Sequence, residues 1–118
     1  MSDKSDITIK VFDAIRHSKP NDAAALLTGY ADSVNVHMVL GSMINGIEYY
    51  QTTLLAWASR RGYHNVVTML LDMGADVSEP ASCGRTPLHF ASWNGHDAVA
   101  TLLLERGANI YAIYRSRG

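Results

Sequence analysis

The side chains that most often carry out chemistry in proteins are not arranged as a catalytic or metal site in this chain. Its five histidines include no His-Glu-x-x-His pair, and the single cysteine, Cys83, excludes any paired-cysteine zinc motif. A cysteine nucleophile also needs a positioned base, and His89 is expected at a helix start instead. Residues 41–46 lack the lysine of a phosphate-binding loop. We therefore expect no enzymatic activity, no metal site and no cofactor in these residues.

Arginine and large aromatic side chains offer a different chemistry, which is the binding of another molecule. The chain has six tyrosines and two tryptophans, and these types, together with arginine, are enriched at the energetic centres of protein interfaces. Ten Lys and Arg against eleven Asp and Glu give a net charge of −1, so a general attraction for nucleic acid is not expected. Whether these side chains share one surface depends on the elements that carry them.

Two segments of the chain repeat each other at a spacing of 33 residues. Residues 53–77 and 86–110 are identical at 11 of 25 aligned positions. In each copy a glycine, Gly62 or Gly95, separates two apolar runs of helical period, and a second glycine, Gly74 or Gly107, follows the second run. Each copy therefore predicts a helix, a turn and a second helix, followed by an extended connection.

A degenerate copy precedes these two and aligns with the middle copy at a shift of 44 residues. Its first helix is expected to start at a Ser5 or Asp6 cap and to end near residues 19–20, and its second to start at an Asn21 or Asp22 cap. The residues expected to face inward from the first helix are Ile7, Ile9, Phe12 and Ile15.

The extra residues between the first two copies fall mainly in residues 34–52 and predict an extended β-hairpin. Apolar residues alternate from Val34 to Leu40, and two turn-forming pairs, Gly41-Ser42 and Asn45-Gly46, follow. Both pairs remain candidates for the tip. The hairpin is either a tolerated insertion or an arm that contacts a partner, with adaptable apolar surface from Met38, Met43 and Ile44.

The last copy resembles the ankyrin repeat. Residues 84–91 read Gly-Arg-Thr-Pro-Leu-His-Phe-Ala, and a 33-residue repeat with Thr-Pro-Leu-His-x-Ala is the signature of that family. The middle copy departs from the pattern at Leu54, in place of proline, and at Ala56, in place of histidine. The N-terminal copy lacks the motif, as a terminal capping repeat does. The resemblance covers residues 5–113.

The resemblance implies an all-α fold, an ankyrin-repeat solenoid of stacked helix-turn-helix units with β-hairpin fingers, one of them extended. Trp57 and Phe90 are then expected in the core, His89 is expected to bond the backbone near Thr86, and His96 to support the turn between helices. The single domain, residues 1–118, would comprise a capping repeat (5–34), an extended hairpin insertion (35–52), a middle repeat (53–85), a last repeat (86–113) and the start of an incomplete finger (114–118).

Ankyrin repeats bind other proteins through finger tips and the exposed side of their first helices. The candidate contacts are positions that lie on this side and vary between copies: Tyr49, Tyr50, Thr52, Arg60, Arg61, Ser82, Cys83, Arg85, Trp93, Asn94, Ile113 and Tyr114. One hypothesis is a partner with acidic or phosphorylated residues that pair with the arginines. The alternative is a protein-binding face whose charge is incidental.

We therefore expect a non-catalytic protein-interaction module whose partner is another protein or peptide. The alternative is a regulatory or targeting arm of a larger enzyme or channel whose activity lies outside these residues, because residues 110–118 begin another finger. The apolar second helix of the last copy, residues 98–104, also suggests self-association through that repeat.

No membrane insertion is expected, because the longest apolar stretch, residues 36–44, is far shorter than the roughly 20 residues of a spanning helix. A lone cysteine and the lack of an Asn-x-Ser/Thr sequence favour an intracellular, cytoplasmic location, with the nucleus also open.

Overall fold

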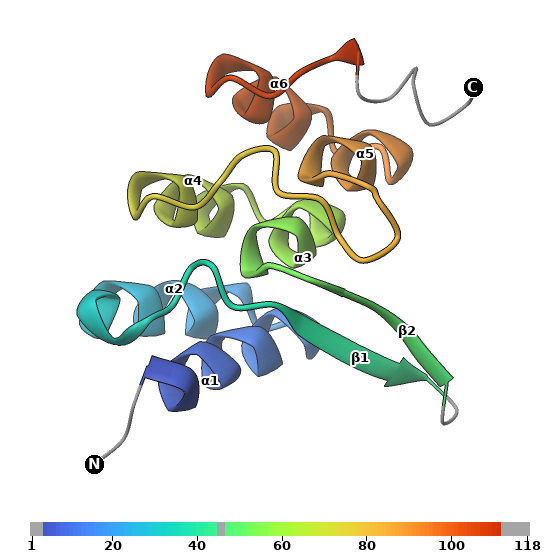
Figure 1. Ribbon diagram of the computed structural model, residues 1–118. Helices are drawn as coiled ribbons and strands as arrows, with labels where there is room; N and C mark the ends of the chain where they lie inside the picture. The colour runs from blue at the N-terminus through green and yellow to red at the C-terminus, as the bar shows by residue number, and fades with distance from the viewer. Residues whose placement is uncertain (1–3, 45–46, 112–118) are drawn as a thin grey trace.

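The computed structural model describes the backbone of residues 4–44 and 47–111 and the side chains of residues 6–41 and 51–111. Within them the helices α1, α3 and α5 lie side by side in one layer, and α2, α4 and α6 form a second layer (Figure 1). The expected stack of helix-turn-helix units is confirmed. The elements in chain order are α1 (Lys4–Arg16), α2 (Pro20–Gly29), the short 3-10 helix η1 (Ala31–Ser33), β1 (Leu40–Ile44), β2 (Ile47–Thr52), α3 (Leu54–Arg61), α4 (His64–Asp72), α5 (Pro87–Trp93) and α6 (Asp97–Glu105).

A hydrogen-bonded cap, formed by residues of the Thr-Pro-Leu-His motif, stabilises the start of α5. The backbone N–H of Thr86 donates to Nδ1 of the buried His89 at 2.8 Å, and the Thr86 hydroxyl lies 2.9 Å from the same nitrogen. This confirms the role expected for His89. At the start of α3 the Thr53 hydroxyl accepts from the Ala56 N–H at 3.5 Å. Alanine has no side-chain acceptor to return that bond, so the middle repeat keeps only half of the cap.

The turn between the two helices of each repeat passes through the left-handed backbone region. Gly62 has φ 76° and Gly95 has φ 75°, and the equivalent residue of the first repeat, Ser18, has φ 61°. Glycine adopts this conformation without steric cost, whereas serine does not. The first repeat therefore keeps the same turn despite lacking the glycine.

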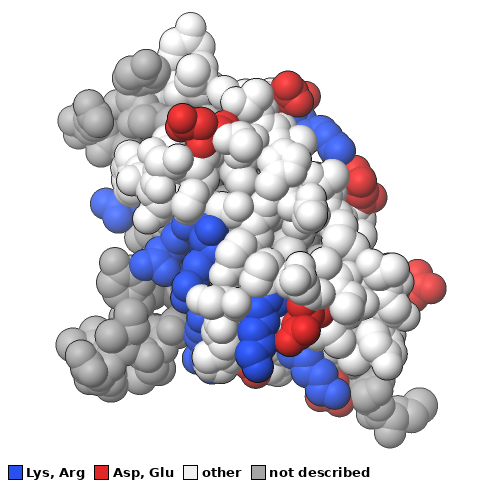
Figure 2. All heavy atoms as spheres, turned by 180° about the vertical axis from the view of Figure 1, so that it is seen from behind, with Lys and Arg blue, Asp and Glu red and all other residues white. Residues whose placement is uncertain are grey.

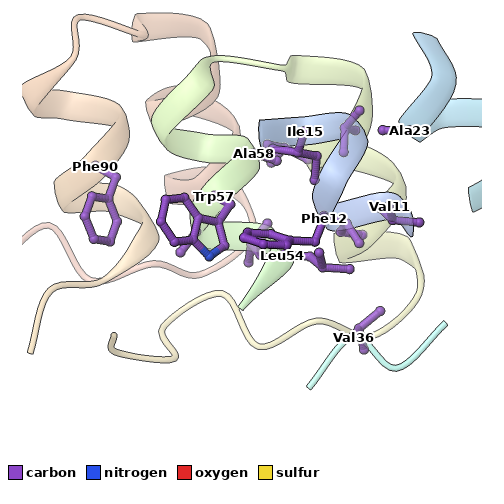
Figure 3. Close-up of a cluster of buried hydrophobic side chains, with 14 of the residues drawn as sticks. Val11, Phe12, Ile15, Ala23, Val36, Leu54, Trp57, Ala58 and Phe90 are labelled. Carbon is purple, nitrogen blue, oxygen red and sulfur yellow. The ribbon is translucent and has the colours of Figure 1, made fainter. Parts of the chain in front are cut away.

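Aromatic side chains join the first-layer helices in the core. Trp57 and Phe90 are each 5% exposed, as expected, and the Trp57 ring meets Phe12 of α1 edge to face at 5.6 Å (Figure 3). The Trp57 indole Nε1 donates to the Leu40 carbonyl at 3.1 Å. Because Leu40 begins β1, this bond attaches the base of the hairpin to α3.

The inward face of α1 differs from the expectation at one position. Ile9 was expected in the core but is 44% exposed, whereas Thr8 and Val11 are fully buried beside Phe12. The Thr8 hydroxyl accepts from the Asn35 N–H at 2.8 Å. This bond to a distant loop orients residues 8, 11, 12 and 15 inward, and it places Ile9 about 100° around the helix from Thr8.

The predicted caps of the first two helices are also wrong. Ser5 and Asp6 lie inside α1, which the structure describes from Lys4 and which ends at Arg16. Helix α2 starts at Pro20, so Asn21 and Asp22 lie in its first turn and do not cap it. Proline favours the first helical position because its fixed φ suits the helix and its missing N–H would have no helical partner there.

The hairpin is shorter than the apolar alternation predicted. Strand pairing begins at Leu40, because the Asn35 side chain accepts from the His37 N–H at 3.0 Å and its carbonyl from the Met38 N–H at 3.2 Å. This turn sends the buried Val36 into the core (Figure 3) instead of into a strand. Ile44 pairs with Ile47. The two strands therefore flank residues 45–46, the second of the two candidate tips.

Replacing Gly62 by alanine is expected to destabilise the fold more than the same change at Gly95. A Cβ at Gly62 would lie 2.5–2.7 Å from ring atoms of His96, whereas a Cβ at Gly95 would meet nothing within 4 Å. Both positions carry the strain of a positive φ, which is worth about 1 kcal/mol. Urea unfolding followed by circular dichroism should show a loss of about 1 kcal/mol for Gly95→Ala and about 2–4 kcal/mol for Gly62→Ala. Equal losses would contradict the close packing of His96.

Substitution of His89 by alanine is expected to lower the free energy of unfolding by about 2–3 kcal/mol. It removes the acceptor of the Thr86 N–H and leaves space in the core. The control is His37→Ala at an exposed position, which should stay within about 0.5 kcal/mol of the parent in the same urea experiment. A His89 variant as stable as the control would show that the cap contributes little.

Candidate binding surface

The C-terminal ends of the three first-layer helices form a continuous row across the repeats. Arg16, Arg60 and Trp93 occupy the equivalent position at the ends of α1, α3 and α5. Arg61 Nη2 donates to the Arg16 carbonyl at 2.8 Å, and His96 Nε2 donates to the Arg60 carbonyl at 2.8 Å. The ends of α1 and α3 are therefore each bonded to the next repeat. We call the row of Arg16, Arg60 and Trp93, with Arg85 beside it, the helix-end stripe.

Internal hydrogen bonds satisfy main-chain carbonyls at this surface. Besides the two bonds above, Asn94 Nδ2 donates to the Phe90 carbonyl of α5 at 2.7 Å. Carbonyls at a helix C-terminus form the negative end of its dipole. Because these are already bonded, the stripe offers guanidinium and indole groups to a partner.

Arg85, on the finger just before α5, and Trp93, at the end of α5, form an exposed pair. The Arg85 guanidinium carbon lies 4.5 Å from the centre of the Trp93 ring, and the His89 ring meets the same indole edge to face at 5.2 Å. Trp93 is 45% exposed, which confirms its expected exposure. The sequence reasoning placed both residues on the binding side but did not predict that they stack. Their separation of eight residues gives no signal of it.

The finger that carries Arg85 is fixed to the hairpin. Ser82 donates its N–H to the Gln51 carbonyl at 2.8 Å, and its hydroxyl accepts from the Gln51 N–H at 2.9 Å. A tight turn follows, in which the Ala81 N–H donates to the Arg85 carbonyl at 2.8 Å. Cys83 is exposed on this turn. Ser82, Cys83 and Arg85 therefore lie together on a finger that is attached to the end of β2.

Three of the predicted contact residues have other positions or roles. Thr52 is 1% exposed, so its prediction as a contact is wrong; along the strand, Gln51 is exposed and Thr52 faces inward. The Arg61 side chain is bonded to the end of α1, and Asn94 caps α5. The side chains of Tyr49 and Tyr50 lie outside the described part of the structure. Ile113 and Tyr114 lie outside it entirely.

The charges of the stripe are only partly neutralised. Among the described residues, salt bridges join Arg16 to Asp13 at 3.3 Å and Arg106 to Asp72 at 2.8 Å, and neither involves Arg60 or Arg85. Figure 2 shows that Lys and Arg side chains gather in the lower half of the face opposite to that of Figure 1, with a few acidic side chains among them. The protein is near neutral as a whole but basic in the lower half of the face drawn in Figure 2.

The surface also has two hollows and a group of exposed apolar residues. A hollow of about 400 Å³ lies beside η1 and Met73, and one of about 250 Å³ lies between the starts of α2 and α4. In the part of the chain that the structure describes, no three His, Cys, Asp or Glu side chains come together as metal ligands, and no helix has the length and apolar character to cross a membrane. Leu104, Ile110 and Tyr111 are exposed in the last repeat, and self-association through it stays a prediction.

Comparison with known proteins agrees with the architecture. The family model described as ankyrin repeats, in three copies, matches residues 13–113. A search of curated proteins found no match to the chain. The family match spans most of the 118 residues and runs from the last turn of α1 past the end of α6. The chain therefore belongs to the ankyrin repeat family.

Proposed function

We propose that this chain is a non-catalytic module that binds another protein through the helix-end stripe and the finger that precedes α5. Ankyrin repeats are in general protein-interaction modules. The observation that carries the proposal here is the Arg85 and Trp93 pair, which exposes a large indole ring and a guanidinium group side by side. Tryptophan and arginine are the residue types that most often dominate the binding energy of an interface.

The packing around Trp93 supports this role. Its ring is in contact with Arg85 and with His89, and His89 is itself buried and bonded to the start of α5. A side chain that is already held in place loses little conformational entropy when a partner binds. Arg16, Arg60, Ser82 and Cys83 complete the proposed surface among the described residues. Tyr49 and Tyr50 of the hairpin stay part of the proposal.

Replacement of Trp93 by alanine is expected to abolish most of the affinity for ligands of this surface. The ligands would be peptides selected from a random display library on the intact parent protein, with dissociation constants measured by fluorescence polarisation. Loss of a central tryptophan costs about 2 kcal/mol or more, so we expect binding about 30-fold weaker.

The matched control is Tyr30→Ala. Tyr30 is an aromatic residue of similar exposure, 53%, but it lies at the end of α2 in the second helix layer. Its removal should leave the affinity within about twofold of the parent. Selected peptides that bind Trp93→Ala as tightly as the parent would sink the proposed surface, provided that circular dichroism shows both variants folded.

A further inference from the structure

The helix-end stripe presents positive charge at the end of each of the three first-layer helices. Arg16 is the last residue of α1, Arg60 is the next-to-last residue of α3, and Arg85 lies over Trp93 at the end of α5. Among the described residues Arg60 and Arg85 have no acidic partner, whereas Arg16 contacts Asp13 at 3.3 Å. Guanidinium groups bind carboxylates in a fork geometry that gives strong hydrogen bonds. The stripe is therefore complementary to a row of acidic side chains.

The spacing of the stripe limits the conformation of such a ligand. Packed helices lie about 8–10 Å apart, and α1, α3 and α5 are direct neighbours. In a polyproline II segment, every third residue points to the same side, with a rise of about 3.1 Å per residue and so about 9 Å between equivalent residues. In a β-strand the side chains that share a face repeat at about 7 or 13 Å, which fits the stripe less well.

The aromatic residue at the end of the stripe also favours this conformation. Proline-rich extended segments bind on exposed aromatic rings, because their backbone is already ordered before binding. Trp93 provides such a ring at one end of the stripe. In an α-helical ligand, side chains seven residues apart share a face and lie about 10 Å from each other, so a helix could also match the stripe. A helix needs about 15 residues to span the three repeats, whereas the extended segment needs about seven.

We infer that the helix-end stripe binds an extended, polyproline II-like protein segment with acidic residues at every third position and a proline or another apolar residue against Trp93. This inference rests on the proposed function. The acidic residues at the Arg60 and Arg85 positions contribute most of the affinity. The one at Arg16 contributes less, because Asp13 already occupies part of that guanidinium.

Three synthetic peptides, two of ten residues and one of 15, test the inference. The first carries three glutamates at every third position with prolines between them, the second has the same composition with the glutamates adjacent, and a third, 15-residue peptide is a helix former with glutamates seven residues apart. Dissociation constants with the intact protein are measured by fluorescence polarisation at low and high salt. We expect the first peptide to bind at least about fivefold tighter than either of the others, and to weaken as salt rises.

Two variants, each of which removes one positive charge from the stripe, test whether the peptide binds there. Arg60→Gln and Arg85→Gln should each weaken the first peptide about fivefold or more. The control, Arg106→Gln, removes an arginine that pairs with Asp72 in the second helix layer and should change the affinity less than twofold. The two stripe variants are independent, so a folding defect in one leaves the other as the test.

The outcomes separate this inference from the proposed function. Equal binding of the spaced and clustered peptides, an equal effect of Arg106→Gln, or a preference for the helical peptide would each overturn the inference. If the library peptides depend on Trp93 but show no acidic residue at every third position, the proposed function stands and the inference fails. If they do not depend on Trp93, the proposed function itself fails.

Discussion

The left-handed turn between the two helices of each repeat sets the geometry of the whole stack. At Gly62 this turn needs glycine for two reasons, a φ of 76° and the contact of its Cα region with the His96 ring of the next repeat. The same histidine donates to the Arg60 carbonyl, and Arg61 reaches the Arg16 carbonyl in the opposite direction. Each turn is therefore bonded to its neighbour, so the distance between repeats is fixed at the ends of the first helices.

This constraint also explains why the proposed binding surface lies where the first-layer helices end. Most of α3 is buried, with residues 54–59 all enclosed by its neighbours and by the base of the hairpin. Only its last two residues, Arg60 and Arg61, are partly exposed. Because bonds between repeats already satisfy the local carbonyls, the groups left for a partner are cationic and aromatic. The structural role of the turn and the chemistry of the surface thus have the same origin.

The features that follow from the repeat pattern can be predicted from the sequence. The features that depend on contacts between residues far apart in the chain cannot. Identity between the copies places the helices, the turn glycines, the buried Trp57 and the exposed Trp93. It misses Thr8, because the bond that buries it comes from Asn35, and it assigns Arg61 to the binding surface although its partner lies 45 residues earlier. The stacking of Arg85 on Trp93 depends on the conformation of the finger. The spacing of the two residues along the chain does not indicate that conformation.

The extended hairpin connects the parts of the surface that come from different repeats. Its base accepts a hydrogen bond from Trp57 of α3, and the end of β2 exchanges two bonds with Ser82 of the last finger. Arg85 therefore lies on a finger that is bonded to the hairpin and leads directly into α5. A surface assembled in this way is ordered before it binds, and binding then costs less conformational entropy. In the proposed binding surface, the role of the hairpin is to hold the finger of Arg85 in place, and this role does not depend on contacts between its own side chains and a partner.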